Sequence, residues 1–157
     1  MASKKRSTNF ARIPNEPNIA NVPKTYIKFE GKPSKRGRDY IGDPTWDVLH
    51  TFGAAYTPDK YLDAVAFVKS LGALFPCAHC RENFKKKLVK YPIENYLKNN
   101  HDFFFWTYLV HDDVNKSYNE HHPDKPQKYS PPFDKVKDWY WQVVSDECKE
   151  CESHLKV

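Results

Sequence analysis

The chain has 157 residues, of which 39% are hydrophobic and 15% aromatic, with five glycines and a formal charge of +5. This length suits one domain of ordinary size, and many rings with few glycines favour a helical bundle over a turn-rich β-sandwich. No run approaches the ~18 apolar residues of a membrane-spanning helix. No apolar stretch follows the first basic residues as a secretory signal requires, so we expect a protein without a membrane span or signal peptide.

The positive charge is concentrated near the N-terminus. Residues 1–40 hold ten lysines and arginines against three acidic residues, whereas the other 117 residues hold 15 against 17. With four prolines and no apolar period, residues 1–38 are predicted to form a flexible basic arm. Such an arm is either a solvated tail or an electrostatic tether to an acidic partner, a membrane face or nucleic acid. Because no base-reading motif accompanies it, nucleic acid is not the expected partner.

Helical periodicity begins after this arm. Asp43 and Pro44 predict the start of a first helix, since Asp caps free amides and Pro fits the first turn. Its apolar face consists of residues spaced by three and four, namely Trp46, Leu49, Gly53 and Tyr56, with His50 on the same face. A second helix is expected to open at Pro58 and to stop near Phe75 and Pro76.

Three further helical segments complete the predicted core. A third helix begins at Cys77 and runs to about Lys90, because Pro92 blocks further helix. Residues 93–97 form a short link to a fourth helix from about His101 to Asn119. After a proline-rich loop, a final helix begins at Phe133. The sequence therefore predicts an all-α fold over residues 39–145, a four-helix bundle with a short fifth helix.

All four cysteines lie in two CxxC pairs, Cys77 with Cys80 and Cys148 with Cys151. Thiols at this spacing can close a disulfide within one helical turn, and the amide dipoles at a helix start favour the thiolate that exchange requires. The pairs are 67 residues apart, against the 15–20 typical of zinc ribbons. We therefore favour redox chemistry over a zinc site and expect no metal.

Four features follow one another along the chain: Trp46-x-x-x-His50, Tyr56, Phe75-Pro76-Cys77-x-x-Cys80 and His111-Asp112-Asp113-Val114-Asn115-Lys116. Taken singly, the histidines and tryptophans are as readily explained by core packing. In order and spacing together, they resemble the Erv/ALR family of flavin-dependent sulfhydryl oxidases, over roughly residues 41–141. The resemblance implies a helical bundle with FAD at its mouth, beside a catalytic disulfide. The cofactor-binding residues that it implies are Trp46, His50, Tyr56, His111, Asp112, Val114, Asn115, Lys116, Lys125 and Trp139.

The chain departs from the family pattern at three places. Asp43 stands where the family usually has an arginine, so another cation must contact the FAD phosphates. Asp112 replaces the asparagine of a His-Asn pair, and an ionised carboxylate cannot donate a hydrogen bond. The structural disulfide of cellular members would fall near Tyr108 and Lys135, so packing must hold that join.

The resemblance also implies a reaction, the oxidation of protein dithiols to disulfides. Electrons would enter at Cys148 and Cys151 in the tail, residues 146–157, pass to Cys77 by thiol exchange, and leave Cys80 as the sulfur nearest the flavin. FAD would pass them to O2, giving hydrogen peroxide. The tail pair can instead be free surface thiols or a staple between two copies.

The family further implies a homodimer and several possible compartments. We favour the host cytoplasm or the virion of a large DNA virus, because signal peptide and structural disulfide are both missing; the mitochondrial intermembrane space is the alternative. Two other function classes stay open: a flavin-free thiol-disulfide exchanger, and a zinc- or nucleic-acid-binding module.

Overall fold

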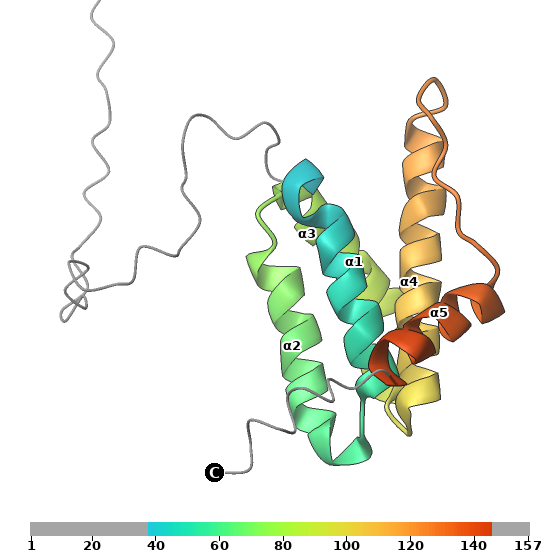
Figure 1. Ribbon diagram of the computed structural model, residues 1–157. Helices are drawn as coiled ribbons and strands as arrows, with labels where there is room; N and C mark the ends of the chain where they lie inside the picture. Colours follow the sequence, from blue (N-terminus) through green and yellow to red (C-terminus); the bar gives the residue numbers. More distant parts are fainter. Residues whose placement is uncertain (1–37, 146–157) are drawn as a thin grey trace, which may run out of the picture. The chain divides into compact units, whose positions relative to one another are not determined.

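A computed structural model describes residues 38–145 of the chain, with side chains from Tyr40 onward (Figure 1). This part of the chain is helical and contains no β-strand, so the predicted all-α fold with five helices is confirmed. The predicted arm and the tail pair Cys148 and Cys151 lie outside it. The elements are α1 (Arg38–Ala55), a 3₁₀ turn (Pro58–Lys60), α2 (Tyr61–Leu74), α3 (Ala78–Lys90), a second 3₁₀ turn (Ile93–Tyr96), α4 (Asn100–His121) and α5 (Phe133–Ser145).

Helix α1 begins earlier than its sequence predicts. The prediction of a start at Asp43 and Pro44 is wrong, because the helix reaches back to Arg38 and Pro44 lies inside it. A proline inside a helix removes one i→i−4 hydrogen bond, and its ring crowds the carbonyl of residue i−4, which here is Tyr40. The Thr45 hydroxyl donates to the Ile41 carbonyl at 2.7 Å, so the turn around the proline has an additional hydrogen bond.

Helix α4 begins at a well-formed cap. The Asn99 side chain accepts a hydrogen bond from the backbone N–H of Asp102 at 2.9 Å, which satisfies one of the free amides of the first turn. Asp102 also places a negative charge at the positive end of the helix dipole. These two residues fix where the longest helix of the described chain starts.

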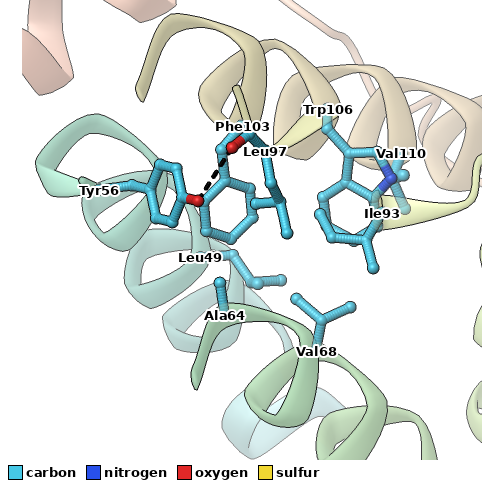
Figure 2. Packing of buried hydrophobic residues seen from close by; sticks show 9 residues of the cluster. All are labelled: Leu49, Tyr56, Ala64, Val68, Ile93, Leu97, Phe103, Trp106 and Val110. Atoms are coloured by element: carbon cyan, nitrogen blue, oxygen red, sulfur yellow. Dashed lines mark hydrogen bonds between the residues drawn. The ribbon is translucent and has the colours of Figure 1, made fainter. Parts of the chain in front are cut away.

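The hydrophobic core lies where α1, α2, α4 and the second 3₁₀ turn meet (Figure 2). Leu49 of α1, Val68 of α2 and Trp106 of α4 are almost completely buried there. The Trp106 indole N–H donates to the Tyr91 carbonyl at 2.8 Å, just beyond the end of α3. A buried indole needs such a partner, and this bond joins the end of α3 to the centre of α4.

Helices α1 and α4 approach each other closely at Gly53. A Cβ atom at Gly53 would lie 3.0 Å from the Cα of Phe104, a contact tighter than nine in ten of those that real Cβ atoms make. Because the helices touch here, the side chains one turn away on each of them meet directly. Those side chains include His50 on α1 and Thr107 on α4.

Helix α5 crosses α1 and α4 at a steep angle (Figure 1). The Phe133 ring lies edge-on to the ring of Tyr108 at 5.2 Å, and Trp141 lies edge-on to Phe104 at 5.1 Å. The Tyr140 hydroxyl donates to the Asp47 carboxylate of α1 at 2.7 Å. Aromatic contacts and one charged hydrogen bond therefore hold the join at which the family places a disulfide.

Candidate functional site

Cys77 and Cys80 are joined by a disulfide at the start of α3. Cys77 is the N-cap residue, and its sulfur accepts a hydrogen bond from the backbone N–H of Cys80 at 3.2 Å. The positive end of the helix dipole lies at the same place and favours negative charge on sulfur. When this disulfide is reduced, the site is therefore suited to hold Cys77 as a thiolate.

The two cysteines differ in their relation to a neighbouring cavity. A cavity of about 410 Å³, which we call the Cys80 cavity, is bounded by residues of α1, α2, α3, α4 and the loop after α4. Cys80 contributes to its wall and Cys77 does not. Its apolar wall includes Trp46, Leu71, Phe75, Phe84 and Val114. The disulfide thus has a cavity side and an opposite side, which separates the roles available to its two sulfurs.

A second cavity of about 400 Å³, the His50 cavity, lies between α1, α4, α5 and the loop that precedes α5. Its wall includes His50, His111, Asp112 and Trp139, although Trp139 is 66% exposed. The two cavities share part of their lining, namely Asp43, Trp46 and Asn115. They are therefore neighbours along one side of α1 and α4.

Stacked rings and hydrogen bonds define the wall of the His50 cavity. The rings of Trp46 and His111 are stacked, 4.2 Å apart and within 4° of parallel. His50 Nε2 lies 3.1 Å from His111 Nδ1. Burial, and then the neighbouring imidazole of His111, lowers the pKa of His50 from 6.5 to about 3. Burial, followed by the positive charge of Lys128, lowers the pKa of His111 to about 4. Both imidazoles are therefore neutral near pH 7.

The loop after α4 contributes a cation to the Cys80 cavity. The side-chain amide of Asn119 bonds the backbone N–H and carbonyl of Lys128 at 2.7 and 2.9 Å, and Asn115 donates to the Ser130 hydroxyl at 3.1 Å. Four residues of helix rise ~6 Å, which nearly equals two residues of extended chain, ~6.6 Å. This match lets Asn115 and Asn119 attach the loop to α4 through three hydrogen bonds. Lys128 lines the cavity with His121 and His122.

Three of the expected cofactor residues line neither cavity. Tyr56 lies in the core, where its hydroxyl donates to the Leu97 carbonyl at 3.0 Å and its ring lies edge-on to Phe103 (Figure 2). Lys116 is exposed and pairs with Asp112 at 2.6 Å. Lys125 is exposed on the loop. The other seven expected residues line one cavity or both.

Sequence reasoning missed Lys128 together with Tyr118, His121 and His122. The available signal was the continuation of the helical period from Val114 through 118 and 121–122, which keeps these positions on the face of α4 that Val114 uses. No comparable signal marks Lys128, because its place depends on the loop's attachment to Asn119.

Residues 38–145 hold neither a metal-binding cluster nor a membrane-spanning helix. No group of three or more His, Cys, Asp or Glu residues lies together in a way that could hold a metal ion. None of the helices described there combines the length and the hydropathy needed to cross a membrane.

The comparisons with known proteins agree on one family. The model of the Erv1/Alr family matches residues 43–140. FAD-linked sulfhydryl oxidase ERV1 of Oryza sativa subsp. japonica is 30% identical over 95 residues, which are 58% of this chain and 48% of that protein. This chain thus spans about half the length of the rice relative.

Two further relatives carry similar names. FAD-linked sulfhydryl oxidase ERV1 of Arabidopsis thaliana is 27% identical over 149 residues, 90% of this chain and 72% of that protein. FAD-linked sulfhydryl oxidase of African swine fever virus (isolate Tick/Malawi/Lil 20-1/1983) is 32% identical over 84 residues, 50% of this chain and 68% of that protein. Since the family match covers more than half of the chain and reaches from α1 into α5, the chain belongs to the Erv1/Alr family.

Proposed function

We propose that the chain is an FAD-dependent sulfhydryl oxidase that forms disulfides in protein dithiols at Cys77 and Cys80. The observation that carries this proposal is the position of the disulfide, with Cys80 in the wall of a cavity lined by aromatic and apolar residues. A planar redox cofactor in that cavity would lie beside one sulfur, while a client thiol could reach the other. The names of the relatives agree with this chemistry.

The residues present fit FAD. The Cys80 cavity offers Trp46, Phe75 and Phe84 as apolar surfaces for a flavin ring, and its Lys128 offers a cation for phosphates. The neighbouring His50 cavity offers the stacked pair of Trp46 and His111 for a second planar ring. FAD is an elongated dinucleotide that contains a flavin ring, phosphates and a second planar ring. Two adjoining cavities with shared walls therefore suit it better than a single compact pocket would.

The protein chemistry begins with thiol exchange at Cys77. A client thiolate attacks the Cys77 sulfur, forming a mixed disulfide, and the bond to Cys80 breaks so that Cys80 leaves as the thiolate. The second client thiolate then attacks the client's own sulfur, which releases the client disulfide and Cys77 as a thiolate. The Cys80 backbone N–H, 3.2 Å from the Cys77 sulfur, stabilises this leaving group.

The client has now lost two electrons, and the reduced pair of Cys77 and Cys80 has gained them. The chemistry supplied by bound FAD is the acceptance of these two electrons from the side of Cys80 and their transfer to O2, which takes up two protons to give hydrogen peroxide. The role of the protein there is to hold Cys80 in the cavity wall at the start of α3.

The absorption spectrum of the purified protein tests the proposal. Bound oxidised FAD gives a yellow protein that is bleached when a dithiol is added without oxygen and regains colour on aeration. A flavin-free thiol-disulfide exchanger, the second candidate supported by the Cys77–Cys80 disulfide, would exchange thiols while colourless. A folded, active and colourless protein that FAD does not change would contradict the oxidase proposal.

Lys128 is proposed to supply the phosphate contact that Asp43 cannot. Lys128→Ala is expected to weaken FAD binding about tenfold, because a charge-assisted hydrogen bond is lost. Flavin fluorescence titration measures this dissociation constant. Lys125→Ala removes the same charge from the same loop but from outside both cavities, and should change affinity less than twofold. Equal weakening by both variants would indicate only a general effect of loop charge.

Cys148 and Cys151 are proposed to carry electrons from clients to Cys77. They lie outside the described residues, and the proposal rests on their CxxC spacing. A Cys148→Ala, Cys151→Ala variant is expected to keep its turnover of a small dithiol and to lose most of its turnover of a reduced protein substrate. Oxygen consumption with each substrate measures both. Equal losses on the two substrates would rule out the shuttle.

A second copy of the chain is proposed to cover an apolar strip on α1 and α2. Val48 and Phe52 are 41% and 50% exposed one helical turn apart, and the Phe52 ring lies 5.2 Å from Phe67 of α2. Phe52→Glu is expected to convert a dimer to a monomer, because a buried unpaired carboxylate is costly. Sedimentation velocity measures the mass. Val89→Glu, on an exposed valine of α3, is the control that should leave the dimer intact.

The compartment is proposed to be the host cytoplasm or the virion, as the similarity to African swine fever virus proteins supports. The mitochondrial intermembrane space is the alternative. Fractionation of cells that produce the chain tests this: recovery within mitochondria would favour the alternative.

A further inference from the structure

A series of hydrogen bonds runs from Thr107 of α4 to His50 of α1 and back to His111 of α4. Thr107 is completely buried, and its hydroxyl donates to the Phe104 carbonyl at 2.7 Å. The same oxygen lies 2.8 Å from His50 Nδ1. A threonine hydroxyl has one hydrogen, and here the Phe104 carbonyl takes it. The hydrogen between His50 and Thr107 must therefore belong to His50 Nδ1.

The hydrogen on His50 Nδ1 also determines the tautomer of His111. A neutral imidazole carries only one N–H, so His50 Nε2 is an acceptor. His111 Nδ1 lies 3.1 Å from that nitrogen and must be its donor. His111 Nε2 is consequently left without a hydrogen. Burial favours the neutral form of both rings, which this count of hydrogens requires.

We propose that Thr107 is a positioning residue of the site, whose hydroxyl sets His50 and, through it, His111 as Nδ1–H tautomers, so that the His50 cavity presents an acceptor nitrogen to its ligand. The tautomer of a histidine is set by the partner of its other nitrogen, and Thr107 is the first partner in this series. The cavity wall then favours a planar ring that bears an N–H or amino donor over one that presents only acceptors.

The inference rests on the proposed function only for the identity of the ligand, an FAD that carries such an amino-bearing ring. The stacked rings of Trp46 and His111 hold the acceptor nitrogen in a fixed plane. Thr107 touches no ligand itself, because it lines neither cavity. Its effect is carried by His50, which is 3% exposed and has its ring close to those of Phe104 and Tyr140.

The first measurement is a long-range ¹H–¹⁵N correlation spectrum of the full chain at pH 7.5, with and without FAD. In the wild type, His50 and His111 should both show a protonated Nδ1 and an unprotonated Nε2. An Nε2–H tautomer at either ring of the wild type would overturn the inference outright, even if no variant folds. A colourless wild type with these tautomers would instead sink the oxidase proposal and leave the tautomer assignment standing.

The second measurement compares variants. Thr107→Val keeps the shape of the side chain but removes the hydroxyl, and should convert His50 to a mixture of tautomers and weaken FAD binding about tenfold. Thr107→Ser restores the hydroxyl and should restore both properties. Thr51→Val makes the same replacement beside His50 on a residue that lines neither cavity, and should change neither. Unchanged tautomers in Thr107→Val, or changed tautomers with unchanged FAD affinity, would refute the positioning role.

Discussion

Cys80→Ala is expected to lower the turnover of a small dithiol roughly a thousandfold or more, since losing the nucleophile of a catalytic unit has effects of this size. The protein should nevertheless stay yellow. Without Cys80 there is no disulfide for a client to reduce, whereas the ring-lined walls of the cavity keep their shape. Oxygen consumption measures the turnover, and the absorption spectrum measures the cofactor retained.

The matched variants separate chemistry from folding. Cys77→Ala should lose turnover to the same degree, because Cys77 is the sulfur that the client attacks. Ala78→Ser changes an exposed residue between the two cysteines and should retain nearly all activity. Full peroxide production by Cys80→Ala would end the assignment of Cys77 and Cys80 as the catalytic pair. Loss of the yellow colour in that variant would show that Cys80 has a role in holding the cofactor.

A second large effect is expected on stability below neutral pH. His50 and His111 have a pKa of about 3 and about 4 in the folded chain, against 6.5 as the ordinary value. Between these values the unfolded chain binds protons that the folded chain does not, so the free energy of unfolding rises with pH. This stability is complete above pH 6.5 and is lost progressively as the pH falls toward 4.

The size of this loss follows from about 1.4 kcal/mol per pH unit for each histidine. At pH 5 the two rings together lower the free energy of unfolding by up to about 4 kcal/mol, a large share of the ~5–15 kcal/mol typical of a domain. Carboxylates have ordinary pKa values of about 4, so the interval from pH 6.5 to 5 reports mainly on histidine.

Urea unfolding at pH 7.5 and pH 5.0, with saturating FAD, measures this loss. His111→Phe keeps a ring against Trp46 but removes one titrating group, so about half of the difference between the two pH values should disappear. The wild type and His111→Phe can differ in their free energy of unfolding at pH 7.5, so only the change in that free energy between the two pH values is compared. An identical pH dependence in both would show that burial does not hold His111 neutral.

The sequence predicted the helices and the pairing of Cys77 with Cys80, because both depend on residues close together in the chain. A 3.6-residue apolar period favours a helix, and Pro92 disfavours helix at the residue before it, just after α3 ends at Lys90. The spacing of Cys77 and Cys80 likewise allows a disulfide within one turn. The exception is the start of α1, where Pro44 predicts a boundary but lies inside the helix.

The positions of the site residues other than the cysteines depend on which helices contact each other. The sequence predicts Tyr56 and His50 on one face of the first helix, yet α1 ends at Ala55. Tyr56 lies just beyond that end and bonds Leu97 in the core, whereas His50 bonds Thr107 beside a cavity. Periodicity assigns a face to a residue but cannot say what covers each turn of that face. Resemblance to a family supplied candidate residues but not these partners.

The disulfide at the start of α3 was thus predictable from the sequence alone. Only the tertiary structure decided that Cys80 belongs to the cavity wall and Cys77 does not, that Lys128 is the cation of that cavity, and that Thr107 orients His50. Each of these depends on contacts between segments distant in sequence, above all the close approach of α1 and α4 at Gly53. The local sequence pattern does not specify the distance between two helices.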